Sequence, residues 1–237
     1  MNDVALVTGG ARRLGREICL MLAEEGCDIA LHYHSSHKDA RRVKDKIEEG
    51  GRRCLLVQGD LTDRSFYRTL IETVFEAFGT LSVLVNNASI FERIDFKQTT
   101  PDVLDRHFLL HLHAPFFLSQ WFAKHSANGV IINVLDSRVS KHSTEYLAYG
   151  LTKQSLRELT LLMAKVLGPR IRVNGICPGP ILPPENQGLD YLNALAEKIP
   201  LKRPGSVSDV LRAIRYLKEA PYVTGDILFV DGGEQLI

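Results

Sequence analysis

Near its N-terminus the sequence reads Val4-Ala-Leu-Val-Thr-Gly-Gly-Ala-Arg-Arg-Leu-Gly15, and the rest of the chain can be interpreted from this stretch. A short apolar run enters a turn that contains glycines, and apolar residues at helical spacing follow it. Strand, glycine turn and helix form the context in which a loose glycine motif predicts a dinucleotide site. Small residues let the backbone approach a pyrophosphate, and a helix N-terminus supplies amide donors. An ordinary strand-to-helix turn remains the alternative.

The composition excludes several classes of protein. With 237 residues the chain suits one α/β domain that can bury a full core. A net charge of +1 gives no electrostatic case for binding nucleic acid or a membrane surface. The four cysteines show no paired spacing, so we expect reduced, structural thiols and no metal site. The first strand leaves no room for a signal peptide, and no apolar run approaches the roughly 20 residues of a membrane span. We therefore predict a cytoplasmic protein.

Apolar runs and helical patterns alternate along the chain, which predicts a doubly wound α/β fold with a parallel sheet. Further strands are expected at 28–33, 54–57, 83–85, 130–135, 171–176 and 227–230, and helices at about 37–49, 64–78, 101–126, 143–167 and 206–217. The segment 181–200 is rich in Pro, Asn, Gln and Gly. A long irregular stretch inside a compact domain is usually functional, so we expect a substrate loop near 178–203.

The end of the second strand predicts which dinucleotide is bound. An NAD site usually has an acidic residue there for the ribose 2′-hydroxyl. Here the strand runs into His32-Tyr-His-Ser-Ser36, with no carboxylate before Asp39. Arg12 and Arg13 lie in the first turn, and guanidinium groups match the geometry of a phosphate. These features favour NADPH, unless the arginines are merely solvated surface charges.

Tyr149 and Lys153 stand four residues apart in a helical pattern and therefore share one helical face. A free tyrosine has a pKa of about 10, and a neighbouring ammonium should lower it and make the phenol a usable general acid. Asp136 ends the strand expected at 130–135, and open α/β sheets place their chemistry at strand ends. The Tyr-x-x-x-Lys spacing alone is a weak signal, and the glycine turn strengthens it.

Other strand ends carry polar residues. Asp60 follows the third strand, where it could accept a hydrogen bond from an adenine amino group or cap the next helix. Asn86 and Asn87 follow the fourth strand and would line the floor of the cofactor site. Phe91 contacts a ligand only if it lies at a pocket mouth; otherwise it belongs to the core.

Taken together, these motifs resemble the short-chain dehydrogenase/reductase family along the whole chain. The matching elements are Thr8-Gly9 with Gly15, Asp60, Asn86-Asn87-Ala88, Tyr149 with Lys153, Pro178-Gly179 and Asp231-Gly232-Gly233. The resemblance implies a Rossmann fold with strand order 3-2-1-4-5-6-7, hydride transfer from a nicotinamide, and a dimer or tetramer. We expect a homotetramer.

Two departures from that family's pattern are more specific. Arg13 replaces the middle glycine of the turn, and Asp136 replaces the catalytic serine. Both resemble the pteridine and dihydromonapterin reductases. That resemblance implies that Arg13 reaches the cofactor phosphates and the pterin, that Phe91 stacks on the pterin, and that Asp136 and Tyr149 supply a proton. A slipped alignment would put Ser137 in the serine's place, and His111 stands where a relay asparagine is usual.

The implied site divides into three sets. The catalytic residues are Asp136, Tyr149 and Lys153. The cofactor residues are Gly9, Arg12, Arg13, Leu14, Gly15, His34, Ser35, Ser36, Asp60, Leu61, Asn87, Ala88, Tyr149, Lys153, Pro178 and Gly179. The substrate residues are Arg13, Ser89, Phe91, Asp136 and Tyr149.

Three functions are consistent with these residues. The first is an NADPH-dependent reductase of a pterin or folate, since an ionised aspartate accepts hydrogen bonds and cannot donate one to a carbonyl oxygen. The second is a carbonyl reductase such as a 3-oxoacyl carrier-protein reductase, for which Lys198, Lys202 and Arg203 could meet an acidic carrier. The third is a cofactor-binding protein without turnover, against which the intact Tyr149 and Lys153 argue.

Overall fold

A seven-stranded sheet forms the centre of the protein, with strand order β3-β2-β1-β4-β5-β6-β7 and every pair parallel. The computed structural model describes residues 3–141, 144–184 and 187–237. The strands are β1 Val4–Val7, β2 Asp28–Tyr33, β3 Cys54–Gln58, β4 Val83–Asn86, β5 Gly129–Val134, β6 Ile171–Pro178 and β7 Ile227–Val230. This is the Rossmann topology, with the strand order, that the resemblance implies.

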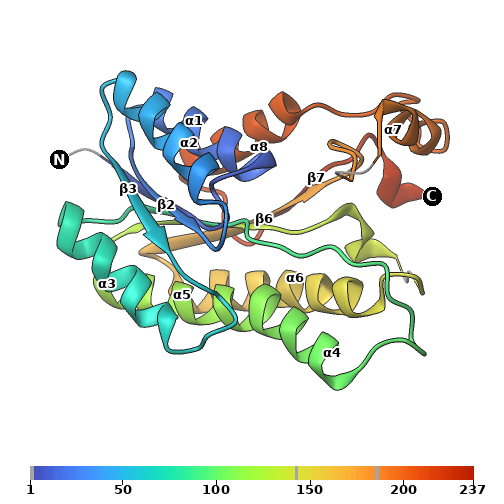
Figure 1. Cartoon of the computed structure of the whole chain (residues 1–237), viewed down its shortest axis with the longest axis horizontal. Helices are drawn as coiled ribbons and strands as arrows, with labels where there is room; N and C mark the ends of the chain where they lie inside the picture. The colour runs from blue at the N-terminus through green and yellow to red at the C-terminus, as the bar shows by residue number, and fades with distance from the viewer. Residues whose placement is uncertain (1–2, 142–143, 185–186) are drawn as a thin grey trace.

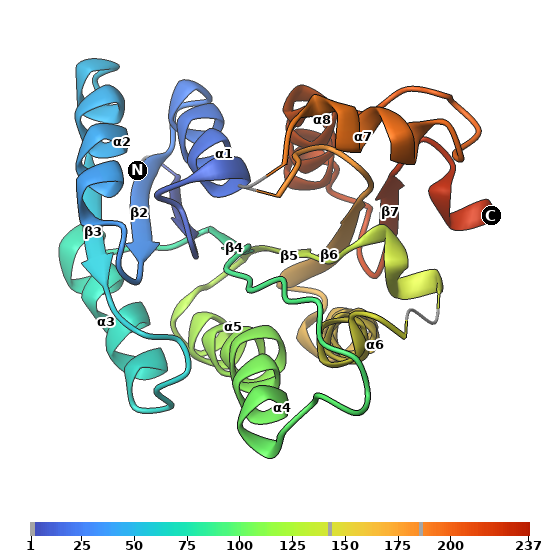
Figure 2. The same ribbon diagram turned by 45° about the vertical axis from the view of Figure 1, so that its right-hand side comes forward.

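Helices cover both faces of the sheet (Figures 1 and 2). One layer holds α1 Arg13–Glu24, α2 His37–Glu49 and α8 Val207–Glu219; the other holds α3 Phe66–Phe78, α4 Pro101–Phe108, α5 Ala114–His125 and α6 Leu147–Leu167. Each layer packs its own apolar core against the sheet. Because both faces are covered, the inner strands are continuous apolar runs rather than alternating ones, as Val4–Val7 illustrates.

The strand order reverses between β1 and β4, and the segments that follow these two strands meet there. Thr8 donates its backbone N–H to the carbonyl of Val85 at 3.0 Å. Its hydroxyl oxygen accepts the backbone N–H groups of Asn87 at 2.9 Å and Ala88 at 3.0 Å. In open α/β sheets this switch point is the usual place for a ligand. The glycine turn and the segment after β4 therefore lie side by side, and both line the same cavity.

Two predicted segments differ from the structure. The helix expected over 101–126 is interrupted by one π-helical turn, Leu109–His113, between α4 and α5. The stretch 181–200 was expected to be irregular, and this is wrong in part because it contains α7, Leu189–Ala196. Leu192 and Ala196 of α7 are buried and lie four residues apart on one face, a pattern that the surrounding Pro, Asn and Gln obscure.

The remaining elements agree with the sequence to within a few residues. The catalytic helix was expected to begin at Ser143; α6 begins at Leu147, and Ser143 lies outside the described residues. The last helix has the cap that was expected. The side chain of Ser206 accepts the backbone N–H of Asp209 at 3.3 Å, and the Asp209 carboxylate accepts that of Ser206 at 2.8 Å. All four cysteines are buried and free.

Candidate active site

The turn after β1 is closed so tightly that only glycine fits at two positions. Gly9 has φ +65°, in the left-handed region that side chains disfavour. A Cβ atom at Gly15 would lie 2.1 Å from the carbonyl oxygen of Gly9 and 2.6 Å from the side-chain nitrogen of Asn87. The backbone therefore forms a cradle that a larger residue would fill. Such a cradle at the start of α1 fits a pyrophosphate.

A cavity of about 630 Å³ opens over this turn. Its volume lies within the range of roughly 300–1,000 Å³ that is typical of cofactor sites. Most predicted cofactor residues line it, namely Gly9, Arg12, Arg13, Leu14, Gly15, His34, Asp60, Leu61, Asn87 and Ala88. Of the other predicted cofactor residues, Tyr149, Pro178 and Gly179 line a second cavity instead. Ser35, Ser36 and Lys153 line neither of these two cavities. The residues of this chain thus fit a dinucleotide along the crevice.

Arg13 has a backbone conformation that is unusual for a residue with a side chain. Its φ is +52°, although it is not a glycine, which is an uncommon and strained conformation. Its guanidinium Nη2 donates a hydrogen bond to the carbonyl of Pro183 at 2.7 Å. Arg13 therefore connects the glycine turn to the segment ahead of α7, and it lines both the 630 Å³ cavity and a second, smaller one.

His32 is a buried residue that the sequence reasoning did not single out. Its Nδ1 accepts the backbone N–H of Gly9 at 3.3 Å, and its Nε2–H donates to the carbonyl of Gly59 at 3.1 Å. Burial lowers its pKa to about 4, so the ring is neutral and keeps this arrangement of donor and acceptor. His32 thereby ties the glycine turn to the end of β3. The sequence feature that could have revealed this role is a histidine within an otherwise apolar strand.

Asp60 does not cap α3, whose N-cap residue is Ser65. Its carboxylate accepts the backbone N–H of Thr62 at 2.8 Å and lies 3.9 Å from Nε2 of His34. Asp60 therefore remains at the rim of the larger cavity, where the adenine of a dinucleotide was expected.

The second cavity, of about 220 Å³, contains the expected chemical groups. Tyr149 donates its hydroxyl to Oδ2 of Asp136 at 2.7 Å, and Oδ1 of Asp136 accepts the backbone N–H of Arg138 at 2.8 Å. Ser137 faces elsewhere and donates to the carboxylate of Glu234 at 2.7 Å. Asp136, and not Ser137, therefore faces the tyrosine. Pro178 and Gly179 line the same cavity.

The expected effect of Lys153 on Tyr149 is wrong in this structure. Burial and the adjacent Asp136 carboxylate raise the pKa of Tyr149 well above its ordinary value, because both disfavour the phenolate. Lys153 lies 5.8 Å from the centre of the tyrosine ring and donates to the carbonyl of Val134 at 2.7 Å. Burial lowers the pKa of Lys153 itself to about 8. Tyr149 is thus a retained proton donor rather than an activated phenolate.

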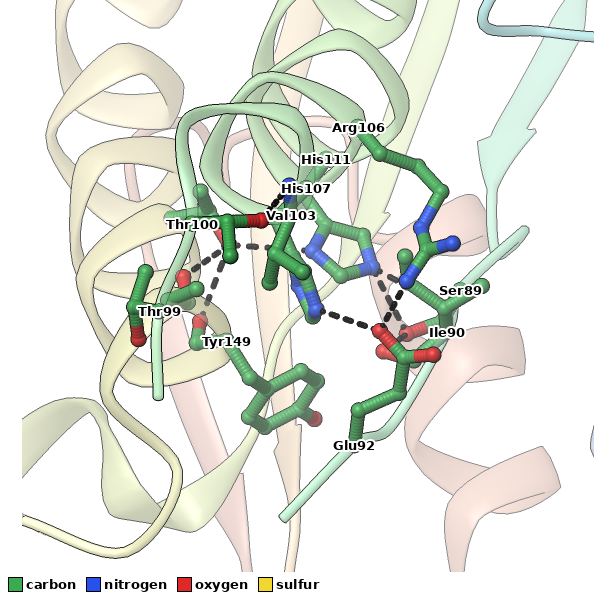
Figure 3. Close-up of polar contacts among 12 residues, drawn as sticks. Ser89, Ile90, Glu92, Thr99, Thr100, Val103, Arg106, His107, His111 and Tyr149 are labelled. Atoms are coloured by element: carbon green, nitrogen blue, oxygen red, sulfur yellow. Dashed lines mark hydrogen bonds and ion pairs between the residues drawn. The ribbon is translucent and has the colours of Figure 1, made fainter. Parts of the chain in front are cut away.

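His111 lies on the π-helical turn and connects three parts of the site (Figure 3). Its Nε2 accepts the backbone N–H of Ile90 at 3.2 Å and lies 3.0 Å from the hydroxyl of Ser89. Because Nε2 is an acceptor, Nδ1 carries the proton and donates to Thr152 at 2.9 Å. Thr152 in turn donates to the carbonyl of Tyr149 at 2.9 Å. Burial, with Lys153 and His107 nearby, lowers the pKa of His111, so this neutral form is retained.

A second histidine, His107, lies next to His111 (Figure 3). The ring of His107 meets that of His111 edge to face at 5.3 Å. His107 Nε2 lies 3.1 Å from Oε2 of Glu92, which also accepts a hydrogen bond from Arg106 at 2.6 Å. No hydrogen bond joins the two imidazoles among the interactions of the described residues, so the pair supports the π-helical turn by packing.

Phe91 lies at the mouth of both cavities and is 42% exposed. Its ring stacks on Tyr146 at 4.5 Å and meets Tyr149 edge to face at 4.8 Å. The guanidinium of Arg138 lies 5.2 Å from the centre of the Phe91 ring. The location excludes the alternative that Phe91 is a core residue.

Comparison with known proteins agrees with this geometry. A family model described as enoyl-(acyl carrier protein) reductase matches residues 9–235. The chain belongs to the short-chain dehydrogenase/reductase family. It is 32% identical to the 3-oxoacyl-(acyl-carrier-protein) reductase of Staphylococcus epidermidis over 98% of this chain and 99% of that protein. As a member of this family it is an NAD(P)-dependent oxidoreductase.

Two solved structures illustrate the range of substrates among short-chain dehydrogenase/reductases. The FolM alternative dihydrofolate reductase 1 from Brucella canis, complexed with NADP, is 34% identical with a TM-score of 0.92, over 99% of this chain and 95% of that one. Acetoin dehydrogenase from Enterobacter cloacae is also 34% identical, with a TM-score of 0.90, over 100% and 97% of the two chains. Equal identity to proteins with different substrates leaves the substrate to be argued from the site.

Within 3–141, 144–184 and 187–237, no three His, Cys, Asp or Glu side chains are grouped so as to hold a metal ion. None of the helices in these ranges is long and apolar enough to cross a membrane.

Proposed function

We propose that this protein is an NADPH-dependent reductase of the C=N bond of a dihydropterin or folate. The observation that carries the proposal is the pairing of Tyr149 with Asp136 at 2.7 Å, while Ser137 is bonded to Glu234. A carbonyl reductase needs a hydroxyl donor where Asp136 stands. An ionised carboxylate cannot donate, and it repels a developing alkoxide.

The chemistry of a pterin suits a carboxylate at this place. The pterin ring carries amino and ring N–H donors, and Asp136 can accept from them. When the cofactor is bound, its nicotinamide supplies the hydride, and the ring nitrogen then needs a proton. Tyr149 holds a proton at its hydroxyl because burial and Asp136 raise its pKa. Lys153 supplies a positive charge near the tyrosine, with its Nζ 5.8 Å from the centre of the Tyr149 ring.

The walls of the smaller cavity also suit a flat, polar ring. Phe91 presents an aromatic ring at the mouth, and aromatic stacking is worth about 0.5–1.5 kcal/mol beyond burial. Arg13 lines the same cavity and is held by Pro183. Ser89 lines the larger cavity beside His111. These are the substrate residues that the resemblance implies, together with Asp136 and Tyr149.

Relatives support the same assignment for cofactor and substrate class. FolM alternative dihydrofolate reductases from Brucella canis and Brucella suis are 34% identical to this chain, and both structures contain NADP. This similarity favours NADPH and a pterin-related substrate here.

A carbonyl reductase is the second candidate, and the match to acyl-carrier-protein reductases favours it. For this function Lys198, Lys202 and Arg203 would meet an acidic carrier near the 178–203 loop. Ser137 would also have to leave Glu234 to serve as a donor. A cofactor-binding protein without turnover is the third candidate; it predicts NADPH binding with no reduction of any substrate.

One screen separates these three functions. Purified protein is mixed with NADPH, and consumption is followed with dihydromonapterin, dihydrobiopterin, dihydrofolate and an acetoacetyl thioester. The proposal predicts consumption with at least one of the first three at a higher kcat/KM than with the thioester. The reverse order contradicts it, and consumption with none supports the third function.

We further propose a homotetramer in the cytoplasm. Exposed apolar side chains on α5 and α6, among them Phe116, Leu151, Leu162 and Val166, would supply an interface. Sedimentation equilibrium measures the assembly size directly, and a monomer at micromolar concentration contradicts it.

A further inference from the structure

Arg138 lines the smaller, 220 Å³ cavity and takes no part in the reaction proposed above. Its backbone is fixed, because its N–H donates to Oδ1 of Asp136 at 2.8 Å and the short 3₁₀ helix Ser137–Ser140 begins there. Within the described part of the chain its side chain makes no hydrogen bond, and its Nη1 is buried without a partner. A buried donor without an acceptor is rare in native proteins and calls for an explanation.

The other charged residues that line this cavity already have hydrogen-bond partners. Arg13 donates to a backbone carbonyl at 2.7 Å. Asp136 accepts the hydroxyl of Tyr149 at 2.7 Å, and Glu234 accepts a serine hydroxyl at 2.7 Å. Of the charged side chains that line the cavity among the described residues, Arg138 is therefore the one whose donors remain available to a ligand.

Two aromatic rings hold the guanidinium of Arg138 in position. Its Cζ lies 5.2 Å from the centre of the Phe91 ring and 4.8 Å from that of Tyr146, and these two rings stack at 4.5 Å. A guanidinium attracted to aromatic rings keeps N–H groups at its planar edge, where they can still donate. Phe91 lies at the cavity mouth, so this positive charge lies close to where a substituent of a bound ring would project.

The ligand that best completes such a group is a carboxylate. A guanidinium stays protonated in proteins, and its parallel N–H donors match the two oxygens of a carboxylate. A neutral hydroxyl offers a weaker acceptor, because a charged acceptor makes the stronger hydrogen bond. Asp136 and Glu234 line the same cavity and would repel a dianionic phosphate more than a singly charged carboxylate.

We propose that Arg138 binds a carboxylate on the tail of the substrate. It thereby selects a dihydropterin with an acidic tail, such as dihydrofolate with its glutamate, over one with a neutral, hydroxylated tail. The pterin ring in this statement rests on the proposed function, whereas the recognition of a carboxylate by Arg138 does not. The proposal adds a specificity-determining residue to the substrate residues expected from the sequence.

The test compares charged ligands with their methyl esters, which lack the charge and change little else. The pairs are dihydrofolate with its dimethyl ester, and acetoacetate with methyl acetoacetate. Calorimetry on the NADP⁺-loaded protein gives the dissociation constants; the oxidised cofactor has no hydride to transfer, so binding is measured without reaction. The value of kcat/KM with NADPH is then measured for each pair that binds. The wild type should bind dihydrofolate about 10- to 150-fold more tightly than its ester, the range of a hydrogen bond to a charged group.

Three variants show whether Arg138 is the cause of that preference. Arg138→Met keeps an apolar stem and should weaken dihydrofolate about 10- to 150-fold, but the ester less than about threefold. Arg138→Lys should recover part of the loss, since it restores the charge and not the planar fork. Arg93→Gln is the control, because Arg93 is exposed, pairs with Glu145 and does not line the cavity. Its loss should change neither ligand by more than about twofold, the effect of an exposed charge.

A purely structural Arg138 would give equal losses for both members of a pair, and that result would overturn the proposal. So would a wild type that binds each acid and its ester equally, or binds neither pair, and this comparison needs no variant to fold. A loss in Arg93→Gln as large as in Arg138→Met would do the same. Failure of the proposed function looks different: the dihydrofolate pair does not bind, while acetoacetate binds more tightly than its ester in the wild type and not in Arg138→Met.

Discussion

The two ends of the crevice are built in different ways. At the end formed by the glycine turn, the backbone shapes the site, as where the carbonyl oxygen of Gly9 lies against Gly15. At the other end, side-chain hydrogen bonds shape the site: Tyr149 bonds to the half-buried Asp136, and His111 bonds to the buried Thr152. The first kind of site tolerates many ligands that carry a pyrophosphate, whereas the second fixes donors and acceptors for one reaction. Variants at the second end should therefore change turnover far more than cofactor binding.

The largest effect is expected for Tyr149→Phe, which removes the phenolic proton and little else. General acid catalysis contributes about 10²- to 10⁴-fold, so kcat should fall by that factor. The dissociation constant of NADPH should stay within twofold of the wild type. Stopped-flow turnover and fluorescence titration measure the two quantities. Retention of most activity would mean that the proton comes from another group, with Asp136 the nearest.

The second largest effect is expected from raising the pH. Lys153 has a pKa of about 8 in the folded protein, so its ammonium is present below that pH and is lost as the pH rises through it. If turnover requires the cation, kcat/KM should be flat below about pH 8. It should fall about tenfold for each pH unit above that value. Lys153→Arg should remove this fall because arginine stays protonated. Lys165→Arg, exposed on the same helix, is the control, and a wild-type profile without the fall contradicts the role of Lys153.

His111→Ala should lower kcat/KM by a smaller factor, because His111 positions the reacting groups and does not itself transfer a proton. It leaves the backbone N–H of Ile90 and the hydroxyl of Thr152 without their partner. An unsatisfied buried group costs roughly 1–3 kcal/mol, about five- to 150-fold in kcat/KM if the loss falls on the reactive geometry. His111→Asn offers both an acceptor and a donor and should recover part of the activity. Equal activity in His111→Ala and the wild type would show that this network does not position the site.

Phe91→Ala should have the smallest effect. Loss of a stacking face corresponds to about two- to 12-fold in kcat/KM for a dihydropterin, from 0.5–1.5 kcal/mol. The loss should appear mainly in KM, since the ring contacts the substrate in both ground and transition states. A thioester, which has no aromatic ring to stack, serves as the control substrate. An equal loss for both substrates would remove Phe91 from the pterin site.

The sequence could predict the parts of the site that are built from local patterns, and not those that depend on contacts between distant residues. The strand, glycine turn and helix from Val4 onward are local, so their pattern predicts both the fold and the crevice. The roles of His32 and His111 depend on contacts with residues 21 or more positions away, such as Gly9, Ile90 and Thr152. Spacing alone carries no such information. Sequence reasoning therefore marked His111 only by comparison with a family and left its tautomer and partners open.

The wrong expectation for Tyr149 has the same origin. The helical spacing of Tyr149 and Lys153 is local and suggested that the ammonium controls the phenol. The carboxylate that controls it comes from the end of β5, 13 positions earlier, and only the packing of α6 on the sheet brings it to 2.7 Å. α7 was missed for a different reason, since its short apolar pattern lies within a segment whose composition is typical of loops.

The central claim is that Asp136 commits this site to a pterin-type C=N bond, and Asp136→Ser tests it most directly. The measurement is kcat/KM for a dihydropterin and for a β-keto thioester in the wild type and the variant. The wild type should prefer the dihydropterin. The variant should lose about five- to 150-fold on it, because the N–H donors of the ring lose their acceptor, and should hold or gain on the thioester. A wild type that prefers the thioester, with a pterin rate unchanged in Asp136→Ser, would contradict the claim.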